Sequence, residues 1–166
     1  SVSLLGPIYA IFVEKLGGGI LDVAGTYAIF SIVYGVLMIF VGKLTDKVKE
    51  KEYFLIAGFF VSAIGFAGYI VAQNSIHLFM IQVILGIAFA IMTPASDALY
   101  TEHLDGGRFA TEWSTWETVW YITEGVGAFL GGVIVHYVGF NALFIVMSAL
   151  SLSAGFYIWF LPRKTL

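Results

Sequence analysis

Three residues of one long apolar segment, Glu117, Tyr121 and Glu124, have types and a spacing suited to proton or cation chemistry. Spacings of four and three place them along one side of a helix. If that helix begins near Arg108, Glu124 lies 16 residues along it, a rise of about 24 Å. No lysine or arginine is expected at that depth, and a lone carboxylate in apolar surroundings is costly while charged. Glu124 and Glu117 are therefore candidates for a proton or cation site. The alternative is a neutral glutamic acid that hydrogen-bonds neighbouring helices.

Three tryptophans recur along the same segment. Trp113 and Trp116 lie near its start, where an aromatic belt at a membrane–water interface is expected. Trp120 lies deeper, and its indole is a candidate lining group for a pathway, as is the phenol of Tyr121. Acidic and aromatic side chains together would line a route for a small solute.

The composition of the chain indicates whether these residues lie in water or in a membrane. Hydrophobic residues make up 60% of the 166 residues and charged residues only 11%, against about 25% charged in soluble domains. So few charges cannot cover a water-soluble surface, and the sequence therefore predicts a polytopic membrane protein.

The same composition excludes several functions. The net charge of −3 offers no basic field for nucleic acid. The absence of cysteine excludes disulfides, thiolate metal ligands and thiol nucleophiles, and the three histidines are widely spaced. No phosphate loop, catalytic triad or zinc signature is present in the sequence. We expect no enzyme, no metal site and no cofactor.

Apolar runs separated by short turns predict six membrane-spanning helices in one domain, residues 1–166. The first run covers only about 22 Å of a hydrocarbon core about 30 Å thick, so either the chain begins inside this helix or the helix is incomplete. Gly6-Pro7 should kink the first helix, Asp22 should cap the second, and Thr93-Pro94 should bend or break the fourth. The expected helices span residues 2–16, 23–41, 53–72, 76–100, 108–137 and 140–161.

The fold class is therefore all-α. Two triplets of helices, residues 2–72 and 76–161, each begin with a helix that contains proline. Three-plus-three inverted repeats with interrupted first helices are common in secondary transporters, and we expect that arrangement here.

Basic residues are unevenly divided between the two ends of the expected helices. Only Lys15 falls at one end. The positive-inside rule then places both termini on the cytoplasmic side of the membrane. We expect that membrane to be the plasma (inner) membrane. The basic residues at the other end are Lys43, Lys47, Lys49, Lys51, Arg108, Arg163 and Lys164.

The loop from Gly42 to Lys51 resembles the signature loop of the major facilitator superfamily, which joins the second and third helices of each six-helix half. Gly42, Leu44, Asp46 and Lys51 match that pattern, and Lys47 is a basic replacement. Lys49 stands in place of a glycine and Glu50 in place of an arginine.

A second resemblance lies in the fifth segment, residues 127–132, which is similar to the superfamily's glycine motif on that helix. Gly127, Gly131 and Gly132 match, and Ala128 replaces a proline. Gly127 and Gly131 are four residues apart and let another helix approach closely.

The sequence around this motif matches the pattern of the superfamily only in part. Gly106-Gly107-Arg108 resembles the entry to that fifth helix. The arginine that usually precedes a glycine on the fourth helix is Gln82 here, which puts proton coupling in doubt.

The resemblance implies secondary transport of a small molecule by one six-helix half, with proton exchange as one mode. Asp46 would belong to a cytoplasmic latch, with Asp97 pairing with the loop around Asp46 or with Arg108. One half cannot enclose a two-sided pathway, so the expected partners are the lipid bilayer, a small-molecule substrate, and a second copy or a second six-helix half. The alternative is a non-transporting membrane assembly protein, which would need no polar stripe on its first, fourth and fifth helices.

Overall fold

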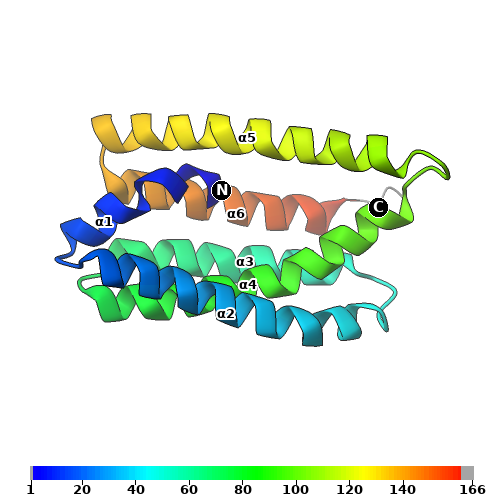
Figure 1. Cartoon of the computed structure of the whole chain (residues 1–166), viewed down its shortest axis with the longest axis horizontal. Helices are drawn as coiled ribbons and strands as arrows, with labels where there is room; N and C mark the ends of the chain where they lie inside the picture. The colour runs from blue at the N-terminus through cyan, green and yellow to red at the C-terminus, as the bar shows by residue number, and fades with distance from the viewer. Residues whose placement is uncertain (1, 162–166) are drawn as a thin grey trace.

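The computed structural model describes residues 2–161, and every regular element in that part of the chain is helical (Figure 1). Five of the helices are long and apolar enough to cross a membrane, which confirms the all-α membrane class. The elements are η1 (Val2–Leu4), η2 (Gly6–Ile8), α1 (Tyr9–Lys15), α2 (Ile20–Thr45), α3 (Glu52–Gly68), η3 (Tyr69–Val71), α4 (Ser75–Glu102), α5 (Phe109–Tyr137) and α6 (Phe140–Phe160).

The first segment is more broken than the sequence predicted. In place of one helix over residues 2–16, two 3₁₀ turns precede the seven-residue helix α1. Pro7 lies at the N-terminal end of the second turn, just after Gly6, where its missing N–H costs no hydrogen bond. The glycine–proline pair therefore divides this segment instead of only kinking it.

One other boundary corrects the prediction, and of the bend or break expected at Thr93-Pro94 the structure rules out only the break. Gly19, not Asp22, is the N-cap of α2, and the Asp22 carboxylate accepts a hydrogen bond from the Gly19 N–H at 2.8 Å. Pro94 lies inside α4 without ending it, because α4 continues to Glu102. Pro94 is covered by α2 at Gly42, where an added Cβ would lie 4.0 Å from the proline Cβ.

Helices α3, α4 and α6 form the packed centre of the bundle, and α2 lies along α4. Glycines let these helices lie close together. A Cβ at Gly58 would overlap the Met92 side chain, and one at Gly86 would lie 3.0 Å from the Phe30 carbonyl oxygen. Helix α5 lies along the outside, as Figure 1 shows, and it contacts mainly α6 and the two 3₁₀ turns.

An apolar core lies toward one end of the bundle. There Phe12 of α1 packs its ring against Tyr69, Phe140 and Phe144, with centroid distances of 4.7 to 5.7 Å. The opposite end carries the loops 46–51 and 103–108 and is called the basic end below.

Candidate functional site

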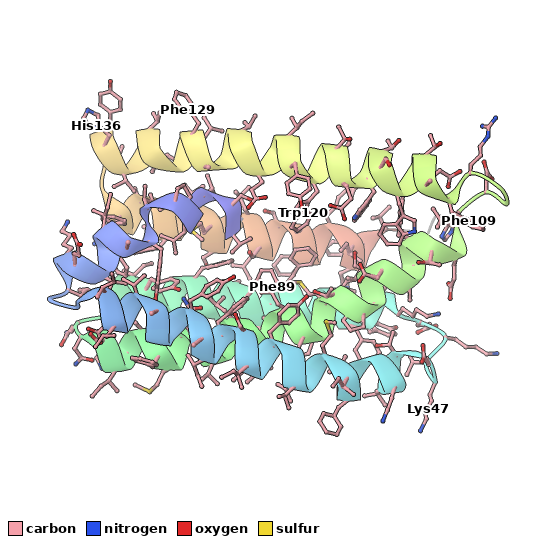
Figure 2. All side chains as sticks on the ribbon, in the orientation of Figure 1. Lys47, Phe89, Phe109, Trp120, Phe129 and His136 are labelled. Carbon is pink, nitrogen blue, oxygen red and sulfur yellow. The ribbon has the colours of Figure 1, made fainter. Side chains whose placement is uncertain are left out.

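The side chains of α5 point in different directions. Trp120 points from α5 toward the other helices, whereas Phe129 and His136 point away from them (Figure 2). Glu124 follows Trp120 by four residues and Glu117 precedes it by three, so both lie on its side of the helix. Tyr121 lies one residue further around and is 65% exposed.

Glu124 lies near the middle of α5, 15 residues after the helix begins, a rise of about 22 Å. Within residues 2–161 its carboxylate makes no salt bridge and no side-chain hydrogen bond. A membrane-depth carboxylate without a partner is satisfied by a proton, by water or by a cation. Glu124 is therefore an exposed carboxylate in mid-helix, on the Trp120 side of α5.

Helices α2 and α4 contribute polar and aromatic groups that the sequence did not single out. The Tyr34 hydroxyl donates a hydrogen bond to the Thr93 hydroxyl at 3.1 Å. The rings of Phe30, Tyr34 and Phe89 contact one another, with centroids 5.8 to 6.5 Å apart. The spacing of four between Phe30 and Tyr34 was a usable signal, but their partners on α4 are too distant in the chain to be inferred from it.

At the basic end, α4 and α5 are joined through Tyr100. Its hydroxyl donates to the backbone carbonyl oxygen of Glu112 at 2.6 Å. Its ring lies 5.0 Å from the Trp113 ring and 4.6 Å from the Trp116 ring. These two tryptophans, expected in an interfacial belt, therefore also anchor the start of α5.

Among residues 2–161, one ion pair joins the loop before α3 to α4. The Lys51 ammonium lies 2.7 Å from a Glu102 carboxylate oxygen, and the Lys51 side chain is only 13% exposed. The sequence pointed to Asp97 as the acidic partner of this loop, but the structure places Glu102, five residues further along α4, in that role. Asp97 instead lies near enough to Glu117 of α5 for their charges to interact.

The remaining latch residues make no such contact within residues 2–161. Asp46 is the C-cap of α2 and binds through its backbone N–H to the Gly42 carbonyl. Neither Asp46 nor Lys47 nor Arg108 forms a salt bridge with another described residue. The structure therefore brings Lys51 and α4 together, and leaves Asp46 and Arg108 at the exposed edge of the basic end.

Of the three glycines in the α5 motif, two contact another segment of the chain and one does not. A Cβ at Gly131 would overlap the Leu4 carbonyl oxygen, and one at Gly127 would lie 2.9 Å from the Ser3 Cβ. An added Cβ at Gly132 would have no neighbour within 4 Å. Contact with η1, through the Ser3 side chain and the Leu4 backbone, thus explains Gly127 and Gly131 but not Gly132.

A family model described as Major Facilitator Superfamily matches residues 1–165 of the chain. The chain is 23% identical over 154 residues to an uncharacterised MFS-type transporter of Methanocaldococcus jannaschii, which covers 93% of this chain and 40% of that protein. It is 25% identical over 167 residues to the multidrug resistance protein MdtG of Erwinia billingiae, covering 96% of this chain and again 40% of the relative.

A third relative has a different length. The chain is 20% identical over 153 residues to an uncharacterised MFS-type transporter, YitZ, of Bacillus subtilis, covering 92% of this chain and 93% of that protein. The chain thus spans about two fifths of the first two relatives and nearly the whole of the third.

Proposed function

The chain belongs to the major facilitator superfamily, and from this premise we propose that it forms half of a secondary active transporter for a small molecule. The observation that carries the proposal is Glu124, a carboxylate in mid-helix without a partner among the described residues, on the same side of α5 as Trp120. A non-transporting assembly protein has no use for an unpaired acid at that depth. The Tyr34–Thr93 hydroxyl pair adds polar groups on α2 and α4, as a solute route needs.

In this proposal Glu124 exchanges a proton between the two sides of the membrane. Charged, it favours a water-filled route or a bound cation; protonated, it tolerates apolar surroundings. Gain or loss of this proton shifts the equilibrium between the two access states, in which the route opens to one side of the membrane or to the other. The shift arises because the two states solvate the carboxylate differently. Asp97 and Glu117, which lie close together nearer the basic end, are the other acids on this route.

The direction we propose is export of a small organic molecule. The glycine motif at residues 127–132 resembles one associated with exporters, and one relative carries the name multidrug resistance protein. The basic end faces the cytoplasm, because the lysines of the loop 46–51 gather there. Arg163 and Lys164, which the sequence argument also used, lie outside the described residues.

A second six-helix unit completes the transporter in this proposal. The one unit has a single packed centre, and α5 lies along its outside, so it does not surround a route on its own. The second unit is either another copy of this chain or the other half of a longer chain.

Flux in sealed vesicles tests the proposal. The chain is reconstituted, and efflux of ethidium and a panel of hydrophobic drugs is followed with and without a pH gradient, for the parent and for Glu124→Gln. We expect the variant to insert normally and to lose gradient-driven flux, since glutamine keeps the shape but carries no exchangeable charge.

Glu14→Gln is the matched control, because Glu14 lies at the end of the short helix α1, away from the proposed route. Its gradient-driven flux should equal that of the parent. Equal gradient-driven flux in Glu124→Gln and the parent would remove Glu124 from the mechanism. No gradient-driven movement of any probe by the parent would contradict proton-coupled transport.

A further inference from the structure

Two histidines, His77 and His103, lie at opposite ends of α4 and use the same ring nitrogen in opposite ways. The backbone N–H of Gln73 donates a hydrogen bond to Nδ1 of His77 at 3.2 Å. Nδ1 of His103 lies 2.8 Å from the carbonyl oxygen of Leu99. A backbone N–H can only donate and a carbonyl oxygen can only accept, so Nδ1 is the acceptor in His77 and the donor in His103.

This difference decides what a proton does at each end of α4. A neutral imidazole has one donor nitrogen and one acceptor nitrogen, whereas an imidazolium has two donors. Protonation of His77 therefore removes the acceptor that Gln73 uses, while protonation of His103 leaves its donor in place. The helix dipole acts in the same sense, because a positive charge is unfavourable at the N-terminus of a helix and favourable at its C-terminus.

The bond at His77 closes the tight turn between η3 and α4. Asn74 is the N-cap of α4, and its side-chain oxygen accepts a hydrogen bond from the His77 N–H at 3.1 Å. In a capping box the third residue of the helix is a glutamate or glutamine whose side chain binds the N-cap N–H. Here the third residue is His77, and its ring binds the N–H of Gln73, one residue earlier. Of the two bonds that fasten this turn, only the one through the ring depends on a proton.

The turn between η3 and α4 lies at the end of the bundle opposite the basic end, and other segments pack on it (Figure 1). An added Cβ at Gly18, between α1 and α2, would lie 3.1 Å from the Ser75 hydroxyl oxygen. One at Gly25 of α2 would lie 2.9 Å from the Phe79 ring. The first turns of α4 therefore support both the α1–α2 connection and the start of α2. This end, called the outer end below, carries the turns at residues 16–19, 72–74 and 138–139.

The outer end offers no counter-charge bound to the His77 ring. Within residues 2–161, His77 forms no salt bridge with a carboxylate. The Asp22 carboxylate accepts a hydrogen bond from the Gly19 N–H, and the Lys15 ammonium lies 5.6 Å from the centre of the Phe140 ring. The charged and titratable side chains that α1, α2 and η3 bring to this end are Glu14, Lys15, Asp22, Tyr27 and Tyr69.

We propose that the turn between η3 and α4 is an acid-sensitive clasp. Protonation of His77 breaks its bond with the Gln73 N–H and loosens the first turns of α4, while the other end of α4 stays bound through His103. A histidine side chain changes charge between about pH 5 and 8, so a mildly acid medium is enough. The bond stabilises the turn while the ring is neutral, and this stabilisation is lost as the pH falls.

The position of the clasp gives it a use in transport. In the proposed orientation the outer end faces away from the cytoplasm, which is the acid side whenever an inward proton gradient drives export. Acid would then loosen the end of the unit through which a solute leaves. The clasp itself rests only on contacts within the chain, whereas its exposure to the acid side rests on the proposed function.

The tautomers of the histidines test the assignment directly, because the chain holds only three histidines. The full chain is labelled with isotopic nitrogen in its histidine rings, placed in lipid nanodiscs, and studied by nuclear magnetic resonance from about pH 5 to 8. At the upper end of this range we expect Nδ1 to be unprotonated in His77 and protonated in His103. Single variants, His77→Gln, His103→Gln and His136→Gln, assign the three signals. A neutral His77 with its proton on Nδ1 overturns the proposal.

Hydrogen exchange of the Gln73 and His77 amides tests the consequence. His77→Gln provides an acceptor at every pH, so its exchange rate removes the general effect of pH on amide exchange. Relative to this variant, we expect the parent to exchange two- to tenfold faster at about pH 5.5 than at about pH 7.5, which is the effect of one lost hydrogen bond. His103→Gln is the matched control and should keep the parental response to acid.

The outcomes separate the clasp from other sources of pH dependence. An equal response to acid in the parent and in His77→Gln overturns it, and so does loss of the response in His103→Gln, which would place the sensor at the basic end. If His77→Gln does not fold, the other two variants still assign the His77 signal by elimination, and its tautomer decides. None of these measurements uses transport, so absence of flux would contradict the proposed function and leave the clasp standing.

Discussion

At the scale of single residues, the pair of adjacent glycines on α5 shows how differently neighbouring positions are used. Gly131 touches the Leu4 backbone, whereas Gly132 is open. We expect Gly131→Leu to destabilise the six-helix unit by about 1–3 kcal/mol, since the backbone contact leaves no room for a side chain. Unfolding in a titration with sodium dodecyl sulfate, followed by circular dichroism, measures this.

Gly132→Leu is the matched control, with the same change in side chain and helix propensity. It should leave the unfolding of a single unit near the parental value. Equal destabilisation by the two variants would show that the contact with η1 does not set the stability of this helix.

The ion pair between Lys51 and Glu102 predicts a change in access rather than in stability. Such a partly exposed pair contributes about 0–1 kcal/mol. That amount still shifts a nearly balanced equilibrium between two access states several-fold. We expect Glu102→Gln to raise the labelling rate of a cysteine placed at Lys49, and the exchange Lys51→Glu with Glu102→Lys to restore it. Unchanged labelling in Glu102→Gln would show that this pair does not hold the basic end closed.

The sequence located the acids but not their partners. Glu124 and Glu117 were recognisable because spacing along one helix and the absence of nearby basic residues are both local properties. The pairing of Lys51 with Glu102 was not, because the two residues are 51 positions apart and several acids near the end of α4 compete on sequence grounds. Contacts between helices depend on rotation about each axis, which the local pattern does not determine.

At the scale of elements, the uncharged runs and the turns between them located the five long helices to within a few residues. The structure of the first segment and the effect of Pro94 were harder to predict. Pro94 lies inside α4, where it removes one helical hydrogen bond, yet α4 continues with α2 packed over it; the residues around Pro7 form only short turns. Whether a proline ends a helix is therefore decided by its neighbours in space.

The contact of Tyr100 with α5 gives a prediction at this scale. Tyr100→Phe keeps the ring contacts with Trp113 and Trp116 and loses the hydroxyl bond to Glu112, a loss of about 0.5–1.5 kcal/mol. Tyr100→Ala loses both. We expect amide hydrogen exchange in the first turns of α5 to rise slightly in the first variant and strongly in the second. Equal exchange in all three proteins would show that α4 does not anchor α5.

At the scale of the whole molecule, the distribution of basic residues predicts orientation. A cysteine at Lys49 should be labelled by an impermeant maleimide only after the membrane is opened, because the loop 46–51 faces the cytoplasm in the proposed topology. A cysteine at Gly18, in the turn before α2 at the opposite end, should be labelled from outside intact cells. The reverse pattern would invert the topology and with it the direction of export.

The backbone contact between Gly131 and Leu4 fixes α5 near one end, and the contacts of Tyr100 with the start of the helix fix it near the other. From Gly131 to Phe109 the helix extends 22 residues, about 33 Å, and no residue from 109 to 130 is buried. A tilt of about 10° around the Gly131 contact would swing the far end by about 6 Å, from the 1.5 Å rise per residue. Such a tilt would break the Tyr100 contacts, so α4 decides whether α5 can move.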